Sequence, residues 1–449
     1  MLKLELTNEF KKIKSKIENL EIFSIWGKIL SIKSSRIEAC GIQNYLSIGS
    51  KCELIDQTNN IIILLEVVGF EKEKIILMPL ENIDGISLNS SKIRVNKKLN
   101  NNGNYIYPDK TWLGKVIDGL GETLDGTDLV KGDKAYKIKA TPPSSMKRQK
   151  LGKKLETGIK AVDCFVSCCI GQKLGIIARS GTGKSVLISM IAKYSTTDVK
   201  IIGLIGERSK EIKEFIENYL DEDGMKNTII IVATSDQSAL TKINATYLTI
   251  TIAEYFRDQG NEVLCIIDSM TRLAMAQREV GLMLGEYPTL GGYTPSVLNI
   301  IPKIIERTGP GEDKASITAF FTVLEEEEND IIGEVLKSFL DGHIILDRSI
   351  AQRQRFPAIN VMESVSRSIP QCNSEEENYL LNLAKNFISK YLEVEELLNL
   401  GIYKKNSNLE LDKAITYYHR IEKFLNQKID QKFSTQESFK KLSEILDIK

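Results

Sequence analysis

The pattern of apolar and polar residues predicts two different structures within the chain's first hundred residues. Over 21–95, short apolar or alternating runs are separated by glycines, a spacing typical of closely packed strands. This pattern predicts a small closed β-barrel. Before it, in residues 1–20, apolar side chains recur every three or four positions on a lysine-rich segment, which predicts one amphipathic helix. These apolar positions are Leu6, Phe10, Ile13, Ile17 and Leu20.

Further along, the pattern changes twice. Between about 150 and 365, apolar strands alternate with helical segments, which predicts βαβ units and a parallel sheet with helices on both faces. After residue 375 the strand pattern ends and apolar residues recur at helical spacing, which predicts a helical C-terminal domain. The expected domains are therefore 1–20, 21–95, 96–370 (an α/β core with a lead-in segment) and 371–449. The predicted strands are 173–178, 201–206, 228–233, 263–268, 317–324 and 343–346; the helical apolar positions are Leu380, Leu383, Phe387, Ile388, Leu392, Ile421, Phe424, Leu425 and Ile429.

Composition narrows the classes of function. Lys plus Arg and Asp plus Glu balance at 60 each, so no overall basic field favours nucleic acid. The 7 cysteines are an odd number and lack metal-ligand spacing, which predicts free thiols in a reducing compartment. The 2 histidines are too few to build a His-rich metal site. No secretory signal or membrane-spanning run is present, so we expect a soluble cytoplasmic protein. For the barrel, a structural or assembly role is favoured over oligonucleotide binding.

A phosphate-binding loop is the strongest chemical signal. The predicted strand 173–178 leads into a glycine-bearing turn that ends in Gly-Lys-Ser, and a helix follows. Its glycines let backbone N–H groups surround a phosphate, Lys184 would reach the β- and γ-phosphates, and Ser185 would ligate Mg²⁺. The flanking strand and helix argue against a chance match in a surface loop. The nucleotide-binding segment comprises Ala178, Arg179, Ser180, Gly181, Thr182, Gly183, Lys184, Ser185 and Val186.

Two further carboxylates stand at the ends of predicted strands. Asp268 ends the apolar strand 263–268, a Walker B pattern in which the carboxylate holds Mg²⁺ directly or through water. Glu207 follows the strand 201–206 and precedes Arg208. A carboxylate there could polarise the water that attacks the γ-phosphate, with the arginine fixing the carboxylate or the phosphate. A strand-end salt bridge is the alternative reading of this pair.

With these motifs in place, the chain resembles the ATPases of type III protein export, in particular the flagellum-specific export ATPases, which are related to the catalytic β subunits of rotary ATP synthases. The resemblance covers nearly the whole chain. It implies a RecA-like core between an N-terminal β-barrel and a C-terminal helical domain, assembled as a six-membered ring. The matching segments are 156–163, 178–185, 206–211, 268–279, 292–297, 340–346 and 356–361.

The resemblance also implies roles for individual residues. Glu207 matches the glutamate that orients the lytic water, and Arg208 its neighbour at the γ-phosphate. Phe356 stands where the family has an aromatic residue that stacks on adenine. Arg367 matches the arginine finger that one subunit offers to its neighbour's nucleotide. The implied cofactor is Mg²⁺ and the implied substrate is ATP.

Partners and location follow from the same resemblance. It implies a homo-hexamer that works with the export apparatus, chaperones and export substrates, in the cytoplasm at the inner face of the plasma membrane. The helix over 1–20 would bind a regulatory, stator-like subunit; packing on the chain's own barrel or lying on a membrane surface are its alternatives. No nucleic-acid partner is expected.

The chain departs from the family pattern at several positions. Ala178 replaces the glycine that usually opens the loop, and Arg179 replaces a second glycine, which puts an extra cation beside the phosphates or in solvent. The acidic loop 325–330 is shorter than usual and lacks a customary proline.

Alternative functions are a non-catalytic ring subunit, a rotary ATP synthase subunit and a hexameric RNA translocase. Glu207 argues against the first, because regulatory subunits carry glutamine there; the absence of a basic, aromatic barrel argues against the last. A vacuolar-type catalytic subunit would need a large insertion that this chain lacks. Flagellar and virulence-secretion members share all of these motifs.

Overall fold

The computed structural model describes residues 24–448 except 57, 60, 97–103, 220–221, 314, 326–329 and 404–406. The helix predicted over 1–20 and most of the acidic loop therefore lie outside the described residues. The chain divides into two compact units, one ending at Asn104 and the other beginning at Tyr105. Each unit is described by itself.

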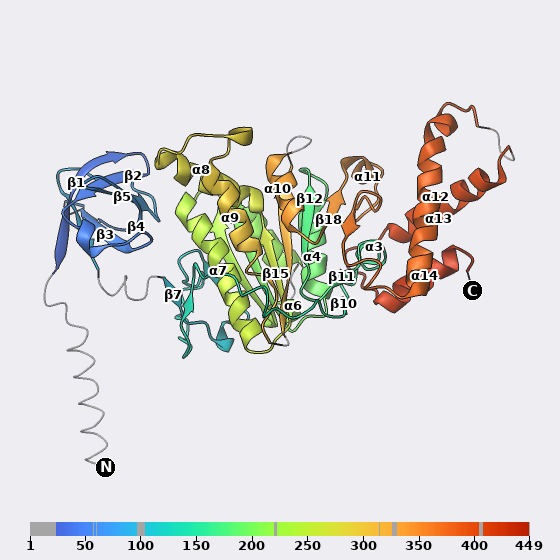
Figure 1. Cartoon of the computed structure of the whole chain (residues 1–449), viewed down its shortest axis with the longest axis horizontal. Coiled ribbons are helices and arrows are strands. Elements are labelled where there is room, and N and C mark those ends of the chain that lie inside the picture. The colour runs from blue at the N-terminus through green and yellow to red at the C-terminus, as the bar shows by residue number, and fades with distance from the viewer. Residues whose placement is uncertain are drawn as a thin grey trace, which may run out of the picture. The chain divides into compact units, whose positions relative to one another are not determined.

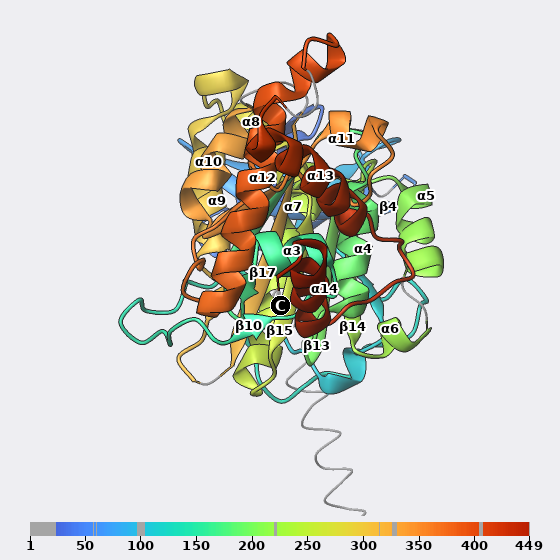
Figure 2. The same cartoon turned by 90° about the vertical axis from the view of Figure 1, so that its right-hand side faces the viewer.

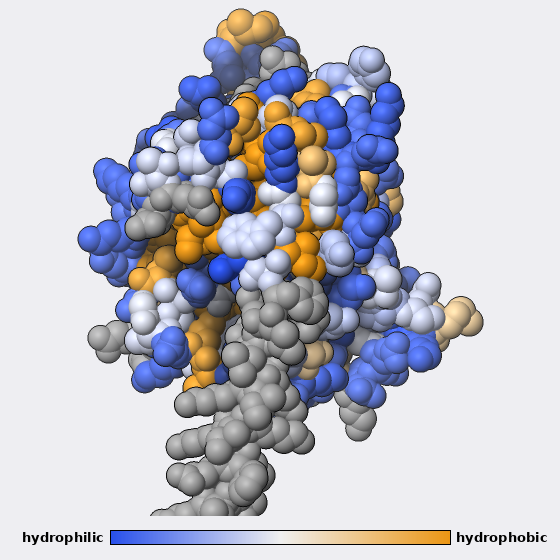
Figure 3. Space-filling view, turned by 90° about the vertical axis from the view of Figure 1, so that its left-hand side faces the viewer, coloured by the Kyte–Doolittle hydropathy of each residue, from blue (hydrophilic) through white to orange (hydrophobic). Residues whose placement is uncertain are grey.

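The first unit is a closed barrel of antiparallel strands in the order β1-β2-β5-β4-β3-β6. Alternate apolar side chains fill its interior, which confirms the predicted barrel. Figure 3 shows apolar side chains gathered in the view toward this end of the chain. In the barrel, Trp26, Leu30 and Leu88 line a hollow of about 630 Å³. The strands are β1 Ile25–Lys33, β2 Arg36–Cys40, β3 Lys51–Asp56, β4 Ile61–Glu71, β5 Lys74–Pro79 and β6 Ser91–Val95.

The second unit is built on a largely parallel sheet in the order β19-β18-β12-β17-β15-β13-β14-β8, with β16 paired to β17 (Figure 1). Its six central strands confirm the six predicted from apolar runs, and they are buried along almost their whole length. The strands are β8 Val116–Asp118, β12 Lys173–Ala178, β13 Val199–Glu207, β14 Thr228–Thr234, β15 Val263–Asp268, β16 Gly309–Pro310, β17 Ser316–Leu324, β18 Gly342–Leu346 and β19 Val365–Ser366; short pairs are formed by β7 Tyr105–Ile106 with β9 Tyr136–Lys137 and by β10 Lys154–Leu155 with β11 Cys168–Cys169.

Helices cover both faces of this sheet, as predicted. Ile202 and Leu204 of β13 pack in one core with α4 and the C-terminal helices. Gly203, between them, faces α7 so closely that a Cβ there would lie 2.6 Å from Oγ1 of Thr249. The helices are α3 Lys160–Phe165, α4 Lys184–Tyr194, α5 Ser209–Glu214, α6 Glu222–Lys226, α7 Ala239–Asp258, α8 Met270–Met283, α9 Pro295–Ile305, α10 Ile331–Phe339 and α11 Arg348–Gln352.

The chain ends in three helices, α12 Glu375–Asn399, α13 Leu409–Leu425 and α14 Thr435–Ile445, which lie over α3 (Figure 2). Ser374 and Glu377 form a capping box at the start of α12. One sequence expectation is corrected here. Ile429 is not on a helix, because α13 ends at Leu425 and the next residues turn to hydrogen-bond the core. Leu392 lies on α12, as its spacing predicts, and its side chain is 46% exposed.

Candidate nucleotide site

The phosphate loop joins β12 to α4 at the carboxyl edge of the sheet. Gly181 and Gly183 have φ of 79° and 87°, a left-handed conformation that glycine adopts without strain. Lys184 is the first residue of α4, so the loop leads directly into the N-terminus of an eleven-residue helix. The positive end of that helix favours an anion at the loop.

Lys184 lies between two carboxylates. Its Nζ forms an ion pair with Oδ1 of Asp268 and lies 3.3 Å from Oε1 of Glu207. Thr322, on β17, donates a hydrogen bond of 2.6 Å to the same Asp268 oxygen. The three charged side chains are largely buried, with exposed fractions of 9%, 5% and 13% for Lys184, Asp268 and Glu207. The C-terminal ends of β13 and β15 thus bring two carboxylates onto one cation, and the neighbouring strand β17 supplies a hydrogen bond to one of these carboxylates.

Burial changes the charges of this group. Loss of water raises the pKa of Glu207 to about 7; the Lys184 ammonium works against this shift and the Asp268 carboxylate adds to it. Burial disfavours the ammonium of Lys184, but the two carboxylates outweigh that effect and raise its pKa. Lys184 is therefore charged at neutral pH, whereas Glu207 is poised between its two forms.

A hollow of about 640 Å³ opens over this triad. Arg208 extends from its wall with a side chain that is 82% exposed and whose Nε lies 4.0 Å from Oε1 of Glu211. Ser185 is exposed and lines the same hollow. The lining residues are Arg179, Ser180, Gly181, Gly183, Lys184, Ser185, Val186, Gly206, Glu207, Arg208, Glu211, Ser235, Arg272 and Leu324.

Arg272 is a site residue that sequence reasoning missed. It lies in the first turn of α8, directly after the strand that ends in Asp268. A Cβ on Gly206 would lie 2.8 Å from Cβ of Arg272, so a glycine at 206 lets this arginine approach β13. Its Nε is buried and has no hydrogen-bond partner among the described residues. The signal was present in the sequence, because a cation follows the Walker B carboxylate by about one helical turn.

Other predicted residues lie around the loop rather than over the triad. Ala178 ends β12 and is buried; Thr182 is also buried, and its Oγ1 donates to the Arg179 carbonyl at 2.8 Å. Arg179 lines the hollow, and its charge acts on the Glu325 carboxyl, whose pKa burial raises and Arg179 helps to lower. The extra cation therefore lies beside the hollow and interacts with Glu325.

Phe356 lies on the other side of the loop. The residue is 39% exposed, and its Cδ1 atom would lie 3.7 Å from a Cβ on Gly183. The segment between α13 and α14 fixes its backbone: Gln427 N donates to the Phe356 carbonyl at 2.8 Å, and Phe356 N donates to Oδ1 of Asn426 at 3.3 Å. Sequence patterns gave no sign of this connection, because it joins segments that are distant in the chain.

Arg367 is the predicted site residue that the structure keeps apart from the triad. It follows β19, its side chain is exposed, and its backbone N donates to the Asp341 carbonyl at 2.8 Å. It is not among the residues that line the hollow over Lys184. Within one chain, therefore, Arg367 does not complete this site.

The donors present suit a magnesium ion bound together with phosphates. Mg²⁺ prefers oxygen ligands and is commonly held by one or two protein oxygens plus substrate phosphates. The Ser185 hydroxyl and the Asp268 carboxylate are oxygens of that kind. Within the described ranges there is no cluster of three or more His, Cys, Asp or Glu side chains that could hold a metal without a substrate.

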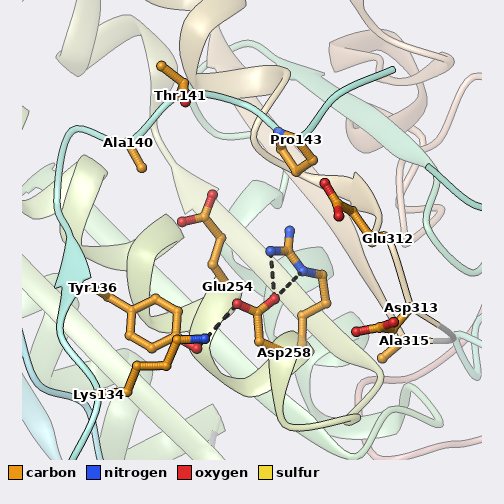
Figure 4. Close-up of a pocket in the computed structure, with 12 residues that line it drawn as sticks. Lys134, Tyr136, Ala140, Thr141, Pro143, Glu254, Asp258, Glu312, Asp313 and Ala315 are labelled. Carbon is orange, nitrogen blue, oxygen red and sulfur yellow. Dashed lines mark hydrogen bonds and ion pairs between the residues drawn. The ribbon is translucent and has the colours of Figure 1, made fainter. Parts of the chain in front are cut away.

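A second hollow, of about 390 Å³, lies at the opposite edge of the sheet, near the end of α7 (Figure 4). Its polar groups largely satisfy one another. Tyr136 donates a hydrogen bond of 3.2 Å to Asp258, whose other oxygen accepts two from Arg257. Glu254 is held by two hydrogen bonds from Arg307 at 2.9 and 2.6 Å. This hollow carries none of the phosphate-loop chemistry.

Comparison with known proteins agrees with this geometry. The ATP synthase alpha/beta family nucleotide-binding domain matches residues 158–366, and the T3SS EscN ATPase C-terminal domain matches residues 373–444. The flagellum-specific ATP synthase of Caulobacter vibrioides is 40% identical, over 96% of this chain and 98% of that protein. The type 3 secretion system ATPase of Xanthomonas euvesicatoria is 37% identical, over 97% of each chain.

Among solved structures, the assembled ATPase EscN of the enteropathogenic E. coli type III secretion system superposes with a TM-score of 0.85 at 34% identity, over 94% of this chain and 100% of that one. In the part of the chain that the structure describes, no helix is both long and apolar enough to cross a membrane. The RecA-like core, the barrel and the C-terminal helices agree with this likeness. The chain thus belongs to the family of flagellum-specific and type III secretion ATPases, and it is an ATPase.

Proposed function

We propose that this protein hydrolyses ATP with Mg²⁺ to energise type III protein export in the assembly of flagella. The observation that carries the proposal is the position of Lys184 between Glu207 and Asp268, under a hollow that opens at the phosphate loop. The relatives are named flagellum-specific ATP synthases and type 3 secretion system ATPases, which supports the export process as the use of that activity.

Each residue has a distinct part in the proposed reaction. Lys184 and the N-terminus of α4 bind the β- and γ-phosphates, and Ser185 and Asp268 hold the metal. When bound, Mg²⁺ would neutralise charge on the phosphate oxygens. Glu207 orients the attacking water and accepts its proton. Arg208, exposed at the wall of the hollow, is free to contact the γ-phosphate once ATP is bound.

Entry of ATP also changes the resting contacts. In the structure, Lys184 neutralises two carboxylates. Phosphates would draw its ammonium toward the loop and release Glu207 from that ion pair, so the carboxylate becomes available to water only in the presence of substrate.

Glu207→Gln tests the catalytic assignment. The variant should bind ATP with near-normal affinity and lose most of its turnover, because the amide cannot accept the proton of water. Lys184→Ala should weaken nucleotide binding and turnover together. Glu211→Gln is the matched control, since Glu211 lines the same hollow with a side chain that is 50% exposed. Phosphate release and nucleotide affinity would be measured for all three, and Glu207→Gln turnover at the parental rate would refute the assignment.

The adenine contact of Phe356 is part of the same proposal. Its half-exposed ring beside Gly183 supports stacking on the base. Phe356→Ala should raise the KM for ATP with a smaller change in kcat, because stacking is similar in the ground and transition states. Phe356→Tyr, which keeps a stacking face, should restore KM. An alanine variant that unfolds, while the tyrosine variant shows no recovery, would identify Phe356 as a core residue instead.

We further propose that the working form is a ring, in which Arg367 reaches the nucleotide of the neighbouring subunit. Its exposure, and its absence from the hollow of its own chain, support that role. The solved structure of EscN described as assembled is consistent with it. We propose that the ring contains six copies of the chain, the number implied by the family resemblance.

The partners and location are also proposals. Deleting residues 1–20 should abolish capture of a stator-like regulatory subunit and leave basal ATPase activity intact, because the phosphate loop lies elsewhere in the chain. Full binding of that partner by the truncated protein would contradict the assignment. Loss of binding to anionic liposomes in the same variant would instead assign 1–20 to the membrane surface, at the inner face of the plasma membrane.

Flagellar export and virulence secretion use the same site chemistry, so they are distinguished by a different experiment. Inactivating the gene in its host should abolish flagellar filaments and swimming, and a copy encoding Glu207→Gln should fail to restore them. Normal filaments, together with loss of secreted virulence proteins, would assign the chain to the other system.

A further inference from the structure

Arg179 and Glu325 lie side by side next to the nucleotide hollow, because they follow the ends of two adjacent strands. β12 and β17 run parallel, and their last residues, Ala178 and Leu324, are paired in the register. The backbone continues this pairing by one step, since Glu325 N donates to the Ala178 carbonyl at 3.0 Å. Arg179 and Leu324 both line the hollow over Lys184. A cation of the phosphate loop and an acid of the neighbouring strand are therefore neighbours beside the phosphate site.

The backbone of Arg179 is fixed, while its side chain is only partly buried. Its carbonyl accepts hydrogen bonds from Thr182 N at 3.3 Å and from Thr182 Oγ1 at 2.8 Å, which close the first turn of the phosphate loop. An arginine side chain has several rotatable bonds and loses little freedom for each hydrogen bond that its planar guanidinium forms. The guanidinium can therefore change partners without any movement of this turn.

Glu325 is a carboxylate with incomplete hydrogen bonding. Its side chain is 15% exposed and lies against the first turn of α10, where a Cβ on Gly333 would be 2.6 Å from Oε1. That oxygen is buried and accepts no hydrogen bond from the described residues, and Nζ of Lys337 lies 3.9 Å from it. Burial raises the pKa of Glu325, and the charges of Lys337 and Arg179 oppose that shift. Because a buried carboxylate is costly without compensation, Glu325 is stabilised by the cation beside it.

We propose that Arg179 is a further nucleotide-binding residue that exchanges partners: it pairs with Glu325 in the absence of nucleotide and turns to the phosphate oxygens when ATP binds. This inference rests on the proposed binding of phosphates at Lys184. Arginine suits such an exchange, since its fork of N–H donors fits carboxylate and phosphate oxygens alike. The interaction with Glu325 must be given up, so it offsets part of the affinity that Arg179 adds.

The exchange also links the nucleotide to α10. Once Arg179 has turned to the phosphates, Glu325 loses one of the cations that act on its charge, and another of them, Lys337, belongs to α10. Nζ of Lys337 also lies 2.8 Å from Oε1 of Glu334, so two carboxylates share this ammonium. ATP binding should therefore tighten the ion pair between Glu325 and Lys337.

A double-mutant cycle on the full-length protein tests the exchange, with affinity for the non-hydrolysable β,γ-imido analogue of ATP measured by calorimetry with Mg²⁺. Arg179→Gln keeps a polar side chain without the charge and should weaken binding about 10-fold, and Arg179→Lys should recover part of that loss. Glu325→Gln should instead tighten binding about 3-fold, because Arg179 no longer leaves a carboxylate. Lys210→Gln is the matched control for loss of a positive charge, since Lys210 is 86% exposed and does not line the hollow; it should change nothing.

The double variant separates partner exchange from a simple effect of charge. With Arg179→Gln already present, Glu325→Gln should no longer change the affinity, because no guanidinium remains to be released. Equal tightening in both backgrounds would mean that Glu325 acts only through its own charge, and it would overturn the exchange. Unchanged affinity in Arg179→Gln would overturn the contact with phosphate. Thermal unfolding of each variant verifies that folded proteins are compared.

Lys184→Ala distinguishes failure of this inference from failure of the proposed function. If Lys184→Ala abolishes binding of the analogue while Arg179→Gln binds it normally, the phosphate site stands and only the role of Arg179 is refuted. If neither variant changes the affinity, phosphates do not bind at this loop, and the proposed site is wrong as well.

Discussion

Among the side chains of the site, Glu207 has a charge that its neighbours control. Burial and the Asp268 carboxylate favour its neutral form, and the Lys184 ammonium favours its charged form. The balance leaves its pKa at about 7, close to the pH at which a general base works best. The same contacts that hold the resting site together therefore set the pH range in which it functions.

We expect kcat/KM for ATP hydrolysis to fall as the pH drops below about 7. The pKa of Glu207 is raised in the folded protein to about 7, so acid protonates its carboxyl and removes the base; the decline should approach tenfold per pH unit. The residual activity of Glu207→Gln should lack this dependence. Steady-state rates between pH 5.5 and 8.5 would test it, and a wild-type profile that stays level down to pH 6 would contradict the role of this carboxyl.

The ion pair of Arg307 and Glu254 contributes to the stability of the fold rather than to catalysis. Arg307 is fully buried, and its guanidinium also donates to the Ile138 carbonyl at 2.6 Å, which ties the lead-in segment to α7. Arg307→Ala should lower the free energy of unfolding by about 3–5 kcal/mol, because it leaves Glu254 buried without its partner. Lys147→Ala, which removes an exposed pair with Glu312 at 3.5 Å, should cost less than about 1 kcal/mol. Urea unfolding compares the two, and similar midpoints would contradict this account.

At the level of elements, the sequence predicted the strands that consist of long apolar runs. The six central strands were predictable because each is buried on both faces and reads as a continuous apolar stretch. Edge strands β8 and β19 were not, since three and two residues are too few to show a period. The end of α13 was also missed, because it is decided by hydrogen bonds to the core rather than by a local glycine or proline.

The candidate site divides in the same way. The phosphate loop, Glu207 and Asp268 were predictable because the loop directly follows an apolar strand and each carboxylate ends one. Two other features depend on tertiary contacts, which periodicity and motifs do not describe. Arg272 lies in the hollow, and Gln427 donates a hydrogen bond to the Phe356 carbonyl. The roles of Arg367 and Phe356 were inferred from family resemblance and remain proposals.

The segment between α13 and α14 should link the C-terminal helices to the nucleotide. The Gln427 side chain accepts from Lys160 N at 3.0 Å and donates to the Gly158 and Gln431 carbonyls at 2.9 and 2.8 Å. Gln427→Ala leaves the buried Lys160 N–H without its partner and removes one of the two donors to the buried Gly158 carbonyl, so we expect about 1–3 kcal/mol of lost stability and a raised KM for ATP through Phe356. Gln431→Ala keeps the carbonyl contact and should change neither. Thermal unfolding and ATPase kinetics would measure both effects, and a Gln427→Ala protein indistinguishable from Gln431→Ala would exclude this link.

For the whole molecule, the proposed role of Arg367 implies that one chain alone lacks a complete site. Lys184, Ser185, Glu207 and Asp268 lie together, whereas Arg367 is exposed elsewhere. Arginine fingers contribute roughly 10³–10⁵ in rate in nucleotide hydrolases that use them. Specific activity should therefore rise steeply with protein concentration as subunits assemble, and Arg367→Ala should flatten that rise while leaving nucleotide affinity nearly unchanged.

The most direct test of a shared site is to mix two inactive variants. Arg367→Ala subunits retain the triad around Lys184, and Glu207→Gln subunits retain the arginine. If Arg367 serves its neighbour, mixed assemblies contain interfaces that pair an intact triad with an intact arginine, and ATPase activity should exceed that of either variant alone at the same total concentration. If mixtures that demonstrably co-assemble recover no activity, Arg367 serves its own subunit or only the fold, and the shared-site account is wrong.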